Sequence, residues 1–203
     1  MECSATIKTR GRPREFDPEQ ALASALRVFW QQGYEGASMT ELTEAMGITK
    51  PSLYACFGNK EALFKKALDL YEREKLCYVS TALEAPTARG VVERLLSGAL
   101  DTHCGSSDPQ GCLGVISMIA CTTEAASIRQ EVIARRASSE AALAARFERA
   151  KAEGDFPDSV DPKALALYLT TVMQGIAIKA QGGASREDLK GVADTFLAIW
   201  PSR

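Results

Sequence analysis

Short polar and cationic side chains gather at the start of one short stretch near residue 50. Thr49, Lys50 and Ser52 lie within four residues of one another, with Pro51 among them. An ammonium group there can donate to guanine O6 and N7, and a proline ring can contact a thymine methyl group. The chemistry indicated is recognition of DNA base edges, with Lys50 as the first candidate and Thr40 as the second. The alternative is that Lys50 is an ordinary solvated lysine on the surface.

Two short helices must position these side chains. Ser38 and Glu41 have the spacing of a capping box, and Gly47 can adopt the left-handed conformation that ends a helix, so the sequence predicts a helix over 39–46. Thr49 can cap a second helix that carries Pro51 in its first turn. The expected shared core is Leu42, Ala45, Ile48, Leu53 and Phe57, and the expected outward face is Lys50, Ser52, Tyr54 and Ala55. This pattern is typical of a helix-turn-helix, whose second helix enters the major groove.

The stretch MTELTEAMGITKPSLYACFGNKEALF, residues 39–64, resembles the DNA-binding domain of the TetR/AcrR repressors. In that family the helix-turn-helix ends in Tyr, two residues, Phe and then a Lys that opens a long fourth helix. The matching residues are Tyr54, Phe57 and Lys60, with Gly33, Tyr34 and Leu42 in the preceding part. The resemblance covers roughly residues 16–64 and implies a transcriptional regulator, most simply a repressor.

The resemblance also implies roles and partners. Tyr54 and Lys60 are implied to contact phosphates, with Ser38, Thr49 and Ser52 as hydroxyl donors. Lys60 would stand at a helix N-terminus, whose amides also attract phosphate. The family further implies a homodimer on a near-palindromic double-stranded operator. It also implies a small-molecule effector, whose binding swings the fourth helix until the two heads no longer fit adjacent grooves.

The N-terminal segment is locally basic although the chain as a whole has a net charge of −2. Residues 1–14 contain four basic residues against one glutamate, a local charge of +3. This composition predicts a flexible basic arm, of which Arg10, Arg12 and Arg14 would enter an adjacent minor groove. The alternative is a solvated tail that makes no contact with DNA.

The rest of the chain has helical periodicity throughout. Helices are predicted over 18–33, from 60 to about 85, and over 87–104, 124–153, 162–182 and 185–200, with a short apolar segment at 112–122. The inner face of the long helix at 124–153 is expected to be Ile128, Val132, Ile133, Leu143 and Phe147. The fold class predicted is all-α with about nine helices. A helix-turn-helix head would occupy 15–60, and a ligand-binding and dimerisation domain 61–203.

The last two helices carry apolar residues around more of their circumference than a lone surface helix would. Pairing them with their copies in a four-helix bundle would bury Leu169, Met173, Ile176, Phe196 and Trp200; the alternative is that they complete the core of the single chain. The family places the effector between head and bundle. Candidate wall residues, each with plain core as its alternative, are Tyr71, Cys77, Leu100, Cys104, Met118, Ile119, Phe147, Tyr168, Thr171 and Gln174.

One group of residues suggests inorganic or redox chemistry: His103, Cys104, Cys112 and Cys121. Histidine and cysteine bind zinc and soft metals, but this spacing fits no zinc pattern, so no metal or other cofactor is expected. Oxidation to a disulfide and simple burial are the other interpretations. A thiol- or metal-responsive repressor is therefore the alternative function.

Other classes of protein lack support in the sequence. The chain has one histidine without a serine elbow beside it, and neither a phosphate loop nor a dinucleotide fingerprint, so an enzyme is not expected. No apolar run approaches the ~20 residues of a membrane span. Six cysteines without a CxxC pair fit free thiols in a reducing cytoplasm. The remaining rival is a helical ligand-binding or adaptor protein whose head no longer binds DNA.

Overall fold

The computed structural model describes residues 16–105, 108–119 and 122–201. Over these ranges the chain forms helices and no strand, which confirms the all-α prediction. The helices are α1 (Pro18–Gly36), α2 (Met39–Met46), α3 (Lys50–Phe57), α4 (Lys60–Lys75), α5 (Cys77–Leu83), α6 (Ala88–His103), α7 (Leu113–Ile119), a 3-10 turn (Thr123–Ala125), α8 (Ala126–Ala152), α9 (Pro162–Gln181) and α10 (Arg186–Ala198). None of the helices in these ranges is long and apolar enough to span a membrane.

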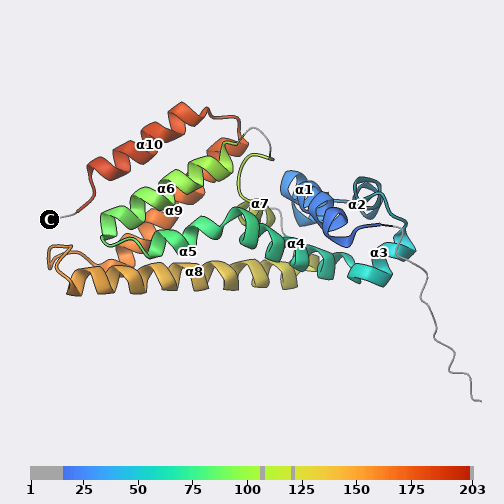
Figure 1. Ribbon diagram of the computed structural model, residues 1–203, viewed down its shortest axis with the longest axis horizontal. Helices are drawn as coiled ribbons and strands as arrows, with labels where there is room; N and C mark the ends of the chain where they lie inside the picture. Colours follow the sequence, from blue (N-terminus) through green and yellow to red (C-terminus); the bar gives the residue numbers. More distant parts are fainter. Residues whose placement is uncertain (1–15, 106–107, 120–121, 202–203) are drawn as a thin grey trace, which may run out of the picture.

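The molecule is elongated (Figure 1). Helices α1 to α3 form a head at one end, and α5, α6, α9 and α10 gather at the other. Helix α4 leads away from the head, and α8 begins beside α4 and runs along the side of the molecule to the far end. The head is therefore joined to the rest through α4, α7 and the start of α8.

Local hydrogen bonds explain why α2 and α3 have the predicted bounds. The Glu41 amide donates to Ser38 Oγ at 3.1 Å, and the Ser38 amide donates to Glu41 Oε2 at 2.9 Å, which completes the capping box. Gly47 ends α2 with φ of 65°, in the left-handed region. Thr49 caps α3 by accepting from the Ser52 amide.

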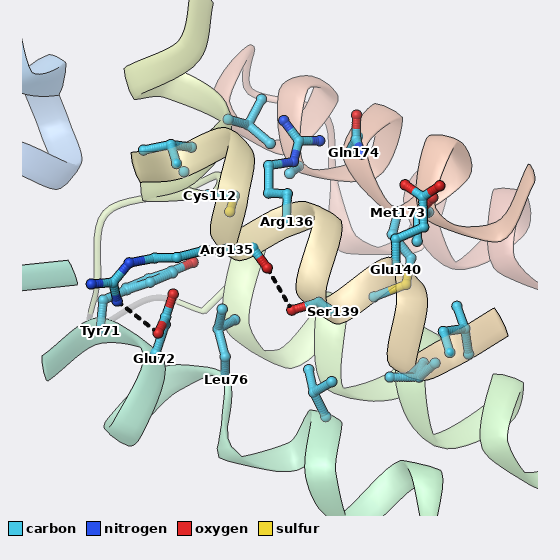
Figure 2. A pocket seen from close by; sticks show the side chains of 18 of the residues that line it. Tyr71, Glu72, Leu76, Cys112, Arg135, Arg136, Ser139, Glu140, Met173 and Gln174 are labelled. Carbon is cyan, nitrogen blue, oxygen red and sulfur yellow. Dashed lines mark hydrogen bonds and ion pairs between the residues drawn. The ribbon is translucent and has the colours of Figure 1, made fainter. Parts of the chain in front are cut away.

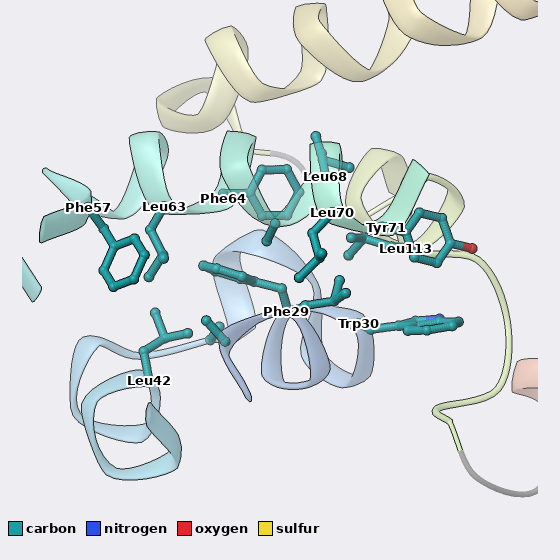
Figure 3. Packing of buried hydrophobic residues seen from close by; sticks show 14 of the residues in the cluster. Phe29, Trp30, Leu42, Phe57, Leu63, Phe64, Leu68, Leu70, Tyr71 and Leu113 are labelled. Atoms are coloured by element: carbon teal, nitrogen blue, oxygen red, sulfur yellow. The ribbon is translucent and has the colours of Figure 1, made fainter. Parts of the chain in front are cut away.

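The core of the head is a stack of aromatic and aliphatic side chains (Figure 3). Phe29 meets Phe64 edge-on at 5.0 Å between ring centroids, and Trp30 meets Tyr71 in the same way at 4.7 Å. Leu113 of α7 lies beside Tyr71 in the same cluster. The packing that holds the head is therefore continuous with α4 and α7.

The expected small core of the helix-turn-helix needs a correction. Leu42, Leu53 and Phe57 are buried, whereas Ala45 is exposed and Ile48 only half-buried. Met46 takes the place expected of Ala45, because residues four apart on a helix share a face.

Helix α4 is shorter than predicted. It ends at Lys75, and α5 begins at Cys77 in a new direction. The Lys75 carbonyl accepts a hydrogen bond from the Thr102 hydroxyl at 3.2 Å, and the bend brings the Tyr78 ring onto Gly98. A Cβ at Gly98 would lie 2.2 Å from Tyr78 Cδ2, so only glycine admits the ring there. Neither proline nor glycine marks this break in the sequence.

Two smaller corrections concern α1 and α8. Gly33, with φ of 74° and ψ of 178°, interrupts α1 as expected, but the helix resumes and ends at Gly36. On α8, Val132 packs inward, whereas Ile133 beside it is exposed.

The second core joins α5, α6, α8, α9 and α10. It contains Leu169, Ile176 and Phe196, together with Trp200, which lies past the end of α10 and packs on Phe147 at 5.5 Å between centroids. These four residues, expected at a dimer interface, are at most 7% exposed within the single chain. The assignment is corrected: they complete the protomer's own core and are not free to contact a partner.

Candidate nucleic-acid interface and ligand pocket

Helix α3 presents its polar start to solvent at the end of the head (Figure 1). Lys50 and Pro51 are exposed, and the large Tyr54 side chain is 54% exposed. Leu53 and Phe57 anchor the opposite face of the helix in the core. This is the arrangement that a recognition helix requires, because its base-reading side chains must be held out by a rigid support.

The hydroxyl groups predicted to contact phosphates also cap helices. Ser38 accepts from the Glu41 amide, and Thr49 Oγ1 lies 3.0 Å from Ser52 Oγ. The cap of Ser38 uses an oxygen lone pair, so its O–H remains a donor. Thr49 and Ser52 hydrogen-bond to each other through one of their two O–H groups, so the other O–H can still donate to a phosphate. Thr40 is exposed on the first turn of α2.

The Lys60 side chain packs over an aromatic ring. Its Nζ lies 4.7 Å from the centroid of the Tyr34 ring, in a cation–π contact. Burial lowers the pKa of Lys60, and the nearby carboxylates of Glu35 and Glu41 oppose that effect. The ammonium group is thus fixed beside the first turn of α4, where Asn59 caps the helix. Arg10, Arg12 and Arg14 lie outside the described residues.

A cavity of about 200 Å³ lies between α4, α5, α6, α7, α8 and α9 (Figure 2). Most of its lining surface is apolar, and polar groups are contributed by Tyr71, Glu72, Tyr78, His103, Cys112, Arg135, Arg136, Ser139, Glu140, Thr170 and Gln174. Pockets for drug-sized ligands begin at roughly 300 Å³. The cavity therefore suits a small molecule.

Two of the predicted wall residues, Tyr71 and Gln174, line this cavity. The predicted dimer residue Met173 lines it as well. The other predicted wall residues do not line the cavity. Cys77, Tyr168 and Thr171 are exposed, and Leu100 and Phe147 belong to the second core. Cys104 is half-buried near Asp101 and Arg186, and Met118 is half-buried next to the cavity wall. The side chain of Ile119 is outside the described part. The sequence predicts which residues belong to helices, but it does not predict which face of each helix borders the cavity.

One side of the cavity is an ion cluster that the sequence pattern did not predict. Arg135 of α8 contacts Asp69 at 2.7 Å, Glu72 at 2.9 Å and Glu131 at 2.7 Å. Burial opposes the charge of Arg135, but the carboxylates outweigh it and raise its pKa. The cluster ties α8 to α4. Two spacings in the sequence signal it: Asp69 and Glu72 fall on one face of α4, and Glu131 lies four residues before Arg135 on α8.

Arg136, the next residue of α8, is in a different environment. Its Nη1 donates to Met118 Sδ at 2.9 Å, and it forms no ion pair with any residue that the structure describes. Figure 2 shows its guanidinium group near Gln174, on the side of the cavity away from Glu72. A thioether is a weak acceptor, so this cation is poorly compensated.

The cavity and the head are joined at Gly111. Trp30 Nε1 of α1 donates to the Gly111 carbonyl at 2.9 Å, and His103 Nδ1 of α6 donates to the same oxygen at 3.0 Å. Since a carbonyl only accepts, the proton of the neutral imidazole is on Nδ1. Burial lowers the pKa of His103 to about 4, so the ring is neutral at neutral pH. One backbone oxygen thus links the head to the cavity wall.

The His/Cys group predicted from sequence does not assemble into a metal centre among the described residues. Cys104 and Cys112 are free thiols, and Cys121 lies outside the described part. Only Cys112 of this set, together with His103, lines the cavity.

Comparison with known proteins identifies the family. Residues 21–67 match the family described as "Bacterial regulatory proteins, tetR family". The chain is 33% identical to the HTH-type transcriptional repressor ComR of Escherichia coli K12 over 96% of this chain and 93% of that protein. It is 32% identical to the repressor BdcR of the same organism over 90% of this chain and 88% of that protein.

A solved structure is similar over almost the same length. The TetR family transcriptional regulator CifR, in a cysteine mutant complexed with 26-bp double-strand operator DNA, has a TM-score of 0.89 and 40% identity. The similarity covers 94% of this chain and all of that one. Because these relatives match the head and the helical remainder together, the protein belongs to the TetR family of transcriptional regulators.

Proposed function

We propose that this protein is a cytoplasmic, ligand-responsive repressor that binds a near-palindromic operator as a homodimer. The observation that carries the proposal is the polar start of α3, exposed at the end of a tightly packed head. The head, residues 15–60, reads DNA, and residues 61–203 bind the effector and the second subunit. CifR, which is 40% identical, was solved on its operator DNA.

In this proposal Lys50 donates to base edges in the major groove and Pro51 contacts a thymine methyl group, with Thr40 beside them. Tyr54 and the free hydroxyl donors of the helix caps bind phosphates and fix the register of the head. Lys60, held over Tyr34, adds a positive charge at the N-terminus of α4.

The dimer surface is proposed on the outer faces of α9 and α10. Leu167, Tyr168 and Ile178 on α9, and Val192 on α10, are between 45% and 54% exposed, and Ile199 just past α10 is 62% exposed. The α9 residues recur at helical spacing together with Gly175, whose missing Cβ faces open space. Exposed apolar side chains in this number indicate a protein–protein interface.

A pair of glutamate substitutions tests this surface. Ile178→Glu is expected to shift the protein from dimer to monomer in sedimentation at micromolar concentration. Ile133→Glu, at an equally exposed isoleucine on α8, is the matched control and should remain dimeric. Monomeric wild-type protein would contradict the proposal.

The effector is proposed to bind in the cavity beside α4. The same helix begins at Lys60 in the head and carries Leu68, Tyr71 and Glu72 into the cavity wall. A ligand that favours a different position of α4 therefore changes the spacing of the two heads. Coupling of this kind amounts to about 1–3 kcal/mol.

The basic arm is proposed to follow the adjacent minor groove through Arg10, Arg12 and Arg14. Each phosphate neutralised contributes about −0.9 to the slope of log K against log salt. Deleting residues 1–14 should make that slope shallower. An unchanged slope would leave the segment as a tail without contact to DNA.

Selection from a random duplex pool tests the function as a whole. The expected result is a near-palindromic sequence bound much more tightly than random duplex. Recovery of no preferred sequence, with only weak binding at low salt, would favour the rival of a ligand-binding or adaptor protein that does not bind DNA specifically.

A further inference from the structure

Arg136 brings a positive charge into the cavity wall without a carboxylate to balance it. The side chain is half-buried, and its guanidinium group donates to the thioether of Met118 and forms no ion pair with a described residue. A charge that leaves water loses solvation free energy, which a counter-ion or hydrogen bonds normally restore. The guanidinium group carries several N–H donors in a planar fork. Most of these donors are therefore available to a ligand in the cavity.

The other charged groups of the wall do not balance Arg136. Arg135 already binds three carboxylates, and that of Glu72 is one of them. Glu140 also lines the cavity, but it lies one turn further along α8, where Figure 2 shows it next to Met173, and it forms no ion pair with Arg136. The described residues thus leave the place of an anion at Arg136 to a ligand.

Two neutral polar groups lie where they can contact such a ligand. Gln174 of α9 lines the cavity beside the Arg136 guanidinium group, and its amide can donate a further hydrogen bond (Figure 2). Tyr71 lies on the other side, next to Glu72; it is 1% exposed, and its hydroxyl makes no hydrogen bond to any described residue. Most of the lining surface is apolar. The cavity therefore combines an anion-binding end with an apolar body.

We infer that the cavity binds small monocarboxylic acids, and that the bound acid releases the operator. This inference rests on the proposed function. The carboxylate accepts two parallel N–H···O bonds from Arg136, the geometry common to guanidinium–carboxylate pairs, and a third bond from Gln174. The hydrocarbon chain lies along the apolar lining, and the volume of about 200 Å³ favours a short chain. A second carboxylate on the ligand would face Glu72 or Glu140, so dicarboxylic acids are disfavoured.

The position of Arg136 on α8 links this ligand to the head. Arg136 follows Arg135, which binds Asp69 and Glu72 of α4. A carboxylate that joins Arg136 to Gln174 draws α8 toward α9 and thereby pulls on the contacts of Arg135. Because α4 begins in the head, the position of the head changes when these contacts change.

Calorimetric titration of the full-length protein at pH 7 tests the binding. The probes are the straight-chain acids from butanoate to octanoate, each compared with its own carboxamide, which has the same shape without the charge. At least one acid should bind roughly 10- to 150-fold more tightly than its amide, as expected for hydrogen bonds to a charged group. Hexanedioate should bind more weakly than hexanoate.

Four variants test the assignment to Arg136. Arg136→Gln should abolish the preference for acid over amide, and Arg136→Lys should keep part of it, because the ammonium group retains the charge but not the fork. Arg129→Gln is the matched control, since Arg129 is an exposed arginine of α8 that does not line the cavity, and it should bind as wild type. Glu140→Gln removes a like charge and should tighten the acid roughly 2- to 5-fold.

Fluorescence anisotropy with the selected duplex tests the release. The acid that binds most tightly, at a saturating concentration, should lower the affinity for the duplex roughly 5- to 150-fold. Its amide at the same concentration should leave the affinity unchanged. Arg136→Lys should bind the duplex as wild type does and need more acid for release.

The outcomes separate this inference from the proposed function. If the duplex is bound but no acid binds better than its amide, or if Arg136→Gln and Arg136→Lys bind the acid as wild type does, the inference is wrong and the repressor stands. Binding of an acid without loss of affinity for the duplex also overturns it. Calorimetry needs no DNA, so failure to bind any duplex would refute the repressor proposal by itself.

Discussion

Gly111 is a position at which a single methyl group should disturb both the backbone and the packing. Its φ is +87°, and a Cβ there would meet Gln181 Cβ at 2.9 Å and the Ala177 carbonyl oxygen at 3.1 Å. Gly154 offers a matched control, because its φ is +88° and a Cβ would meet nothing within 4 Å. Alanine at either position adds the same backbone strain, but only Gly111→Ala adds the collision with α9.

The two contributions can be estimated separately. Alanine in the left-handed region costs about 1 kcal/mol once the loss of glycine's freedom in the unfolded chain is subtracted. Overpacking of a filled core adds about 1–3 kcal/mol. Gly154→Ala is thus expected to lower the free energy of unfolding by about 1 kcal/mol, and Gly111→Ala by about 3 kcal/mol. The difference corresponds to roughly 4–8 °C in Tm for a chain of this size.

Thermal unfolding of both variants at one protein concentration measures this difference, since dimerisation makes Tm depend on concentration. Gly111→Ala should also change affinity for the operator, because the Gly111 carbonyl holds Trp30 of the head. Equal Tm values for the two variants would refute the reasoning that α9 closes tightly over Gly111.

Three further predictions concern the head and the buried histidine. Lys50→Ala should weaken binding to the selected duplex by about 1–3 kcal/mol and relax its sequence preference, whereas Lys163→Ala, at an exposed lysine of α9, should bind as wild type; gel-shift titration on specific and random duplexes checks both. Tyr54→Phe should weaken specific and random duplex alike by about 1 kcal/mol with Tm unchanged, because the side chain is 54% exposed; a loss confined to the specific duplex would contradict a phosphate contact. Folding lowers the pKa of His103 from 6.5 to about 4, so the unfolded chain binds the extra proton between these values. Relative to His103→Asn, wild type should therefore keep its full stability above pH 6.5 and lose about 3 kcal/mol as the pH falls to 4, as measured by urea unfolding at each pH; parallel curves would show that the ring is not buried neutral.

The helix-turn-helix could be predicted from the sequence because its information is local. Ser38, Glu41, Gly47 and Thr49 make their capping contacts within a few residues of themselves, so α2 and α3 begin and end where expected. The outward position of Lys50 and Tyr54 follows from the same short periodicity. These features need no knowledge of distant contacts.

The break between α4 and α5 could not be predicted, because its causes are far away in sequence. Thr102 binds the last carbonyl of α4, and Gly98 makes room for Tyr78. For the same reason the cavity wall was largely missed: its position depends on where α5, α8 and α9 pass one another. Arg135 ties α8 to α4 through Asp69 and Glu72, which lie more than 60 residues away in the sequence.

The outer surface of the bundle shows a related limit. Periodicity found the apolar residues of α9 and α10 but could not divide them between the protomer's core and its surface. Leu169 and Phe196 are inside, whereas Leu167 and Ile178 are outside. When a helix is apolar on two faces, the elements that pack against it decide which face is buried in the protomer.

The spacing of the two operator half-sites tests the central claim most directly. If two α3 helices of one dimer reach one face of the DNA, inserting half a helical turn between the half-sites turns one of them to the opposite face. Affinity for the altered duplex should then fall to that of random DNA, a loss of roughly 10³-fold or more. Binding that is indifferent to the inserted half turn would show that the heads do not act as a pair.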